Sequence, residues 1–137
     1  MKQSAKITLT VLAWFQAIST VIGWVTLWFV PHIYDSTLDP TPFAGQQILA
    51  GFLLGVIVGG PQWAAIIIER VKPQWRALAH LVAGFVMMCW VFGECLVLNS
   101  FNWAHALWGG IGLLQLVFVA IFLGALEPTY SRPAANP

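Results

Sequence analysis

The most constraining feature of this 137-residue sequence is a series of four long apolar segments joined by short polar ones. We place them at residues 7–30, 46–68, 77–98 and 103–126. Each is long enough to cross the hydrocarbon core of a bilayer, which takes about 20 residues of α-helix. Runs this long predict helices, because the strands of a membrane barrel alternate apolar and polar residues.

The composition leaves little material for a water-soluble domain. Hydrophobic residues make up 59% of the chain and charged residues only 8%, whereas soluble domains carry about 25% charged residues. The four segments and their connections use nearly the whole length. We therefore expect one integral membrane domain over residues 1–137. It should be an all-α bundle of four antiparallel transmembrane helices, followed by a mobile tail over residues 128–137.

The basic residues predict how such a bundle is oriented. Cytoplasmic loops of membrane proteins carry an excess of lysine and arginine. The connection over residues 69–76 is a short basic loop, whereas residues 31–45 contain no basic residue other than a histidine. Both termini are therefore predicted to be cytoplasmic, in a multi-pass protein of the plasma membrane. All six basic residues fall on the predicted cytoplasmic side: Lys2, Lys6, Arg70, Lys72, Arg76 and Arg132.

Glu94, inside the third apolar segment, is the first candidate for a functional side chain. An ionisable residue at such a position costs about 2.5–3.5 kcal/mol, so it normally faces a partner or a cavity. Residues 99–102 form a tight turn that places His105 of the fourth segment at a similar depth. Glu94 could carry a proton, bind a cation or tie the two helices together. His105 could form a pH-sensitive pair with it or contact lipid headgroups.

His80 precedes Glu94 by 14 residues, which returns it to within about 40° of the same helix face. The stripe of residues 80, 84, 87, 91, 94 and 98 should therefore face the bundle interior. Gln16, Gln62 and Gln115 lie near the middle of their segments. Together with Ser19 and Thr20, they could complete a proton relay. Equally, amides and hydroxyls at such depths commonly hold membrane helices together.

Small residues in the second segment predict close helix packing. Gly51, Gly55 and Gly59 recur every four residues, which lets another backbone approach one face of the helix. This face could pack within the bundle or against a second copy of the chain. Pro61 removes a backbone hydrogen bond in mid-segment and should kink the helix.

The sequence contains no pattern that specifies catalysis. Its three histidines lie at different depths and lack the spacing of a metal site. No serine has a plausible base, and no glycine-rich phosphate loop is present. The net charge of +1 gives no indication of nucleic-acid binding. We therefore predict neither a metal nor another cofactor, and an enzyme is the least favoured class.

Four short motifs stand out in the sequence: Thr41-Pro42-Phe43, Trp90-Val91-Phe92-Gly93-Glu94, Ser100-Phe101-Asn102-Trp103 and Gly112-Leu113-Leu114-Gln115. With these motifs the chain resembles a group of small four-helix membrane proteins encoded by actinobacteria. The similarity extends over residues 41–116 and implies a bacterial plasma-membrane protein of a group without assigned activity. It increases the interest in Glu94 and in the turn before the fourth segment.

Two classes of function follow from these observations. The preferred hypothesis is a non-enzymatic protein that acts by association, as a homo-oligomer or as an accessory subunit of a larger membrane complex, in contact with membrane lipids. The alternative is a small transporter or channel, or a protein that binds a lipid or another small molecule. In that case Glu94 would be the coupling or binding group, in a cavity lined by Gln16, Gln62, His105 and Gln115.

Overall fold

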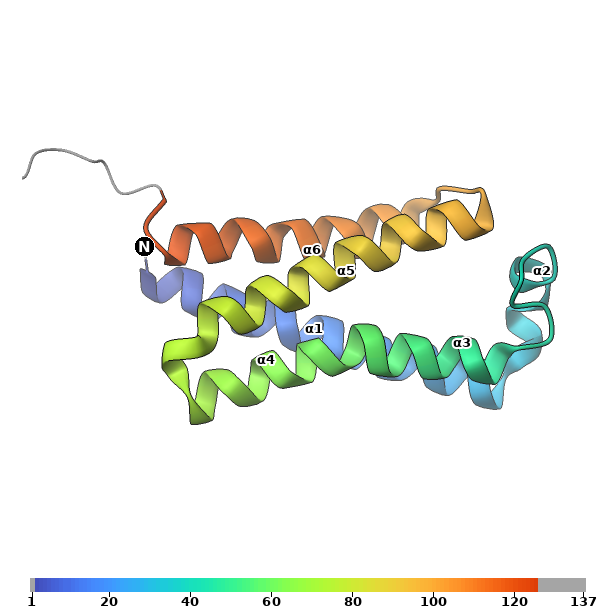
Figure 1. Cartoon of the computed structure of the whole chain (residues 1–137), viewed down its shortest axis with the longest axis horizontal. Helices are drawn as coiled ribbons and strands as arrows, with labels where there is room; N and C mark the ends of the chain where they lie inside the picture. Colours follow the sequence, from blue (N-terminus) through green and yellow to red (C-terminus); the bar gives the residue numbers. More distant parts are fainter. Residues whose placement is uncertain (1, 126–137) are drawn as a thin grey trace, which may run out of the picture.

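The computed structural model describes residues 2–125, and all regular secondary structure within them is helical (Figure 1). Four long antiparallel spans confirm the predicted four-helix bundle. The predicted tail and the last residue of the fourth segment lie outside the described residues. In chain order, the elements are α1 (Lys2–Phe29), η1 (Pro31–Ile33), α2 (Asp35–Leu38), α3 (Gln47–Leu53), η2 (Leu54–Gly59), α4 (Gly60–Val71), η3 (Pro73–Trp75), α5 (Arg76–Leu98) and α6 (Trp103–Phe122).

The outer surface of the bundle is apolar along all four spans. Each span is long and apolar enough to cross a membrane, and no more than 33% of any span's apolar window is buried inside the protein. Large side chains such as Phe85, Phe92 and Val117 point outward and are exposed. So extensive an apolar surface is compatible with a membrane protein, since monomeric soluble proteins rarely expose large continuous apolar patches.

The two ends of the bundle differ in charge. At one end, here called the basic end, α1 begins and the chain turns from α4 into α5 (Figure 1). The opposite end, here called the loop end, carries residues 30–46 and the turn between α5 and α6. Among the described residues, lysine and arginine side chains belong to the basic end, as the sequence predicted. Arg132 lies outside the described residues.

The second span changes its helical geometry halfway along. α3, η2 and α4 follow one another without a break, and η2 is a π-helical segment. Pro61 stands in the first turn of α4, directly after η2. Proline has no N–H, so Pro61 leaves the preceding turn of the continuous helix one backbone hydrogen bond short. The irregularity predicted at Pro61 is therefore a π-helical segment before the proline. Such segments often occur at functional sites.

The glycine face of the second span packs within the chain, against α1. A Cβ atom added to Gly51 would lie 2.6 Å from Trp28 Nε1, and one added to Gly59 would lie 2.8 Å from Thr20 Oγ1. The same test at Gly55 meets a tryptophan, Trp24, at 3.0 Å. The small residues thus create room for large side chains of α1. This resolves the open choice between packing inside the bundle and packing against a second copy.

The turn between α5 and α6 is built by two asparagines. Asn99 ends α5 in the left-handed conformation, with φ of 44°, and the Ser100 N–H donates to the Cys95 carbonyl at 3.2 Å. Asn102 then caps α6. α5 packs along α6 and, toward the basic end, on α4, whereas α3 packs on α1. Figure 1 shows α5 diverging from the second span toward the loop end.

Candidate functional site: a cavity at the loop end

A cavity of about 560 Å³ lies where the helices diverge at the loop end. Its walls come from α1, α3, α5 and α6 and from the segment that follows α1. Most of the lining is apolar, and Leu27, Leu54 and Trp108 are among its members. A few polar side chains interrupt this apolar lining: Tyr34, Thr37, Glu94, Asn102 and His105.

The structure brings Glu94 and His105 together on the wall of this cavity. The His105 Nε2 atom lies 4.0 Å from Glu94 Oε2. The His105 side chain is only 6% exposed, whereas that of Glu94 is 40% exposed. The short turn between α5 and α6 therefore places the two residues at the same depth within one bundle, as the sequence indicated.

The orientation of the His105 ring is fixed by the cap of α6. The Asn102 side chain accepts hydrogen bonds from the N–H groups of Ala104 and His105, at 2.9 Å and 3.3 Å. In return, His105 Nδ1 accepts the Asn102 N–H at 3.1 Å. Since Nδ1 is an acceptor, the proton of the neutral ring is on Nε2, which faces Glu94. This capping box thus sets the donor that the carboxylate faces.

Glu94 keeps hydrogen-bonding capacity for a ligand. A separation of 4.0 Å from His105 Nε2 is longer than a hydrogen bond. The Trp90 side chain, one turn earlier on α5, also interacts with the carboxylate. An ionised carboxylate has about four acceptor positions on its two oxygens. Part of the Glu94 side chain is therefore available to the cavity.

A smaller cavity of about 160 Å³ continues from Glu94 toward the middle of the bundle, where Thr20 and Met87 line it. Gln16 lies one turn from Thr20 on α1 and is completely buried. Neither its amide nitrogen nor its amide oxygen has a hydrogen-bond partner among residues 2–125. Gln16 is thus a predicted site residue whose fully buried amide the described part of the chain leaves without a hydrogen bond.

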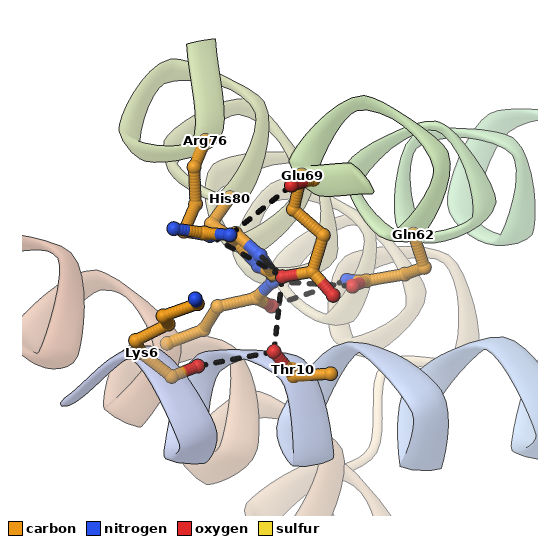
Figure 2. A network of polar contacts seen from close by, with 7 residues as sticks. Lys6, Thr10, Gln62, Glu69, Arg76 and His80 are labelled. Atoms are coloured by element: carbon orange, nitrogen blue, oxygen red, sulfur yellow. Dashed lines mark hydrogen bonds and ion pairs between the residues drawn. The ribbon is translucent and has the colours of Figure 1, made fainter. Parts of the chain in front are cut away.

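A second polar cluster closes the basic end around Glu69 (Figure 2). The Glu69 carboxylate lies 3.1 Å from His80 Nε2 and 3.0 Å from the Thr10 hydroxyl. Arg76 donates to the Glu69 backbone carbonyl at 3.1 Å, and its Nε lies 3.6 Å from the carboxylate. The cluster joins α1, α4 and α5. The side chains of Glu69 and Arg76 are both largely buried.

Gln62 and Gln115 extend this cluster into the bundle. Each amide donates to the other, at 3.3 Å and 3.2 Å. Gln62 also donates to the Ala83 carbonyl at 3.2 Å, and Gln115 lies 3.1 Å from His80 Nδ1. An amide nitrogen can only donate, so His80 Nδ1 accepts and His80 Nε2 donates to Glu69. The Ala83 carbonyl can only accept, so it identifies the Gln62 amide nitrogen, and this orientation determines the direction of the other hydrogen bonds in the chain.

The position predicted for Glu69 was wrong. The sequence placed it in a basic loop, but it lies in the last turn of α4 and is 6% exposed. Arg76 likewise begins α5. The helix continues past the apolar run because Glu69 finds partners on two other helices. One signal was present in the sequence: Glu69 follows Gln62 by seven residues, which places both on one helix face.

An apolar layer separates the two polar regions. His80, Gly84, Met87 and Val91 are all buried on one face of α5, as predicted. Met87 and Val91 pack against Val58 of the second span. Within residues 2–125, no continuous chain of hydrogen bonds joins His80 to Glu94. Of the other proposed relay groups, Ser19 bonds to a carbonyl of its own helix.

Comparisons with known proteins reveal no relative of this chain: no protein-family model, curated protein or solved structure matches it significantly.

Proposed function

We propose that this protein is a multi-pass membrane protein that binds a small amphipathic molecule in its loop-end cavity. The cavity itself carries the proposal. Its volume of about 560 Å³ falls within the roughly 300–1,000 Å³ of small-molecule sites, which are mostly apolar with a few placed polar groups. An apolar lining with Glu94 and His105 on its wall has this composition.

The charge distribution supports an outward-facing site. Basic residues concentrate at the other end of the bundle, and the positive-inside rule assigns that end to the cytoplasm. The cavity would then open in the outer half of a bacterial plasma membrane, with both termini inside. A ligand dissolved in the outer leaflet could reach it without crossing the bilayer.

The closed basic end favours binding over conduction. Glu69, Arg76 and His80 hold α4 and α5 together there. Val58, Met87 and Val91 form an apolar cluster between that polar cluster and the larger cavity, beside the smaller one. A channel or a proton relay would need polar groups through this layer. The cavity is therefore best interpreted as a site closed toward the basic end.

Association with other copies or with a larger membrane complex stays a prediction. One of its supports, beside the absence of a catalytic pattern and of a soluble domain, was the face of Gly51, Gly55 and Gly59. Those glycines pack on α1 within the chain, so they provide no surface for a partner. Binding in the cavity is thus the function that the geometry supports best.

Photolabelling tests the proposal with a matched pair of variants. The probe is benzophenone, a neutral molecule that cross-links to nearby C–H bonds on illumination, added to protein purified in dodecylmaltoside. Gly93 lines the cavity, and a Cβ atom added there meets no atom within 4 Å. Gly110 has the same free space but lies outside the cavity lining.

We expect saturable labelling of cavity residues in the natural protein and in Gly110→Phe. Gly93→Phe should abolish it, because the phenyl ring occupies the cavity. Labelling of lipid-facing residues should be non-saturable and equal in all three proteins, which serves as the internal control. Saturable labelling that persists in Gly93→Phe, or none in the natural protein, would contradict the proposal.

A further inference from the structure

We infer that the molecule bound in the loop-end cavity is an organic cation, with Glu94 as its counter-ion. This inference rests on the proposed function and narrows it to one class of ligand. It starts from the two kinds of side chain that interrupt the aliphatic lining, one carboxylate and several aromatic rings.

The permanent charge of the cavity lining is negative only. Among the described residues that line the cavity, Glu94 is the one acidic side chain, and no lysine or arginine is present. The nearest basic group is His105, 4.0 Å away. Its Nδ1 is occupied by the cap of α6, so the neutral ring offers a single N–H toward the carboxylate. Glu94 consequently lacks a permanent cation within the protein, and a ligand could supply one.

Arginine and lysine of the basic end cannot fill this role. Arg76 is held by Glu69 in the other polar cluster, and Met87 and Val91 lie between that cluster and Glu94. A carboxylate in an apolar site interacts strongly with a nearby opposite charge, because the local dielectric constant is low. Apart from a protonated His105, the charge that complements an ionised Glu94 would therefore enter with the ligand.

The aromatic lining favours an organic cation over a metal ion. Trp90 and Trp108 line both cavities together with Glu94, and Tyr34 and Phe43 line the larger one. The faces of such rings attract ammonium groups, and tryptophan does so most strongly. A metal ion would need several oxygen or nitrogen ligands, whereas among residues 2–125 no group of three histidine, cysteine or acidic side chains could hold one.

Three photoprobes that share one scaffold test this assignment. They are (4-benzoylbenzyl)trimethylammonium, which is cationic, neutral 4-methylbenzophenone and anionic 4-benzoylbenzoate. Saturable labelling of the cavity is measured for each as a function of concentration, in neutral dodecylmaltoside. The variants are Glu94→Gln, which keeps the shape of the side chain, and Glu94→Asp, which keeps its charge.

The cation should half-saturate the cavity at a concentration about tenfold or more below that of the anion. Glu94→Gln should remove this preference and leave neutral labelling unchanged, which shows that the variant is folded. Glu94→Asp should retain the preference in part. Equal labelling by cation and anion, or a preference that survives in Glu94→Gln, would overturn the inference while neutral labelling still supports the cavity as a site. Absence of saturable labelling by all three probes would instead overturn the proposed function.

A competitor identifies the source of the cation. Dihexanoylphosphatidylcholine carries the same trimethylammonium group within a lipid headgroup. Displacement of the cationic probe by benzyltrimethylammonium but not by the lipid would identify a free organic cation, and displacement by the lipid would identify a phospholipid headgroup; either result supports the organic cation. Displacement by neither compound would overturn the inference.

Discussion

His105 Nε2 lies 4.0 Å from Glu94 Oε2, while Nδ1 of the same ring accepts the backbone N–H of Asn102 at 3.1 Å. One histidine therefore helps to cap α6 and also faces the carboxylate that lines the cavity. Because the cap fixes the ring, the N–H that Glu94 meets is positioned before any ligand arrives.

The hydrogen bonds of two histidines predict their tautomers. His80 accepts from Gln115 at Nδ1, and His105 accepts from Asn102 at the same atom. Both neutral rings should carry their proton on Nε2. Nitrogen-15 spectra of histidine-labelled protein, with His80→Gln and His105→Gln used for assignment, distinguish the two nitrogens. A protonated Nδ1 in either neutral ring would show that its hydrogen-bond network is organised differently.

Gln115 should be important for stability. Gln115→Leu leaves Gln62 Oε1 and His80 Nδ1 without their donor, and a buried group that loses its hydrogen bond costs about 1–3 kcal/mol. The midpoint of thermal unfolding in dodecylmaltoside should fall. Gln3→Leu is the control, because Gln3 is exposed on α1. Equal midpoints for the two variants would rule out a stabilising role for the glutamine pair.

Glu69 and Arg76 should behave as a coupled pair. Removing one partner of a buried ion pair costs about 3–5 kcal/mol, since the other charge stays uncompensated. Glu69→Ala and Arg76→Ala should each lower the free energy of unfolding substantially. The double variant should lose clearly less than the sum of the two. Strict additivity in this double-mutant cycle would mean that the two side chains do not interact.

Gly51 should tolerate no side chain. In Gly51→Ala the new methyl group would lie 2.6 Å from Trp28 Nε1 and displace an indole that donates to the Ile48 carbonyl. Overpacking of this kind typically costs about 1–3 kcal/mol. Gly110→Ala is the matched control, because its Cβ meets open space and alanine favours a helix by about 0.5–1 kcal/mol. A thermal midpoint that rises in both variants would contradict the packing of α3 on α1.

The number and pairing of the helices could be predicted because membranes impose simple rules on the sequence. Long apolar runs define the spans, and a turn of four residues forces the third and fourth spans to be neighbours. The same turn predicted that Glu94 and His105 lie at a similar depth. Periodicity along α5 correctly placed residues 80, 84, 87 and 91 inside.

Other features depend on contacts between segments far apart in the sequence. Glu69 resembles a loop residue in the sequence, and only its contacts with Thr10 and His80 on two other helices explain its burial. The glycine face has no visible partner until α1 supplies its tryptophans. The cavity arises from the divergence of α5 from the second span, which no local pattern encodes.

The small-molecule content of the protein extracted from its own membrane tests the central claim most directly. The natural protein, Gly93→Phe and Gly110→Phe are purified in parallel in mild detergent, and bound compounds are quantified by mass spectrometry. Binding in the loop-end cavity predicts a compound present in stoichiometric amount with the natural protein and Gly110→Phe and depleted in Gly93→Phe. Identical small-molecule content in all three preparations would contradict the proposal.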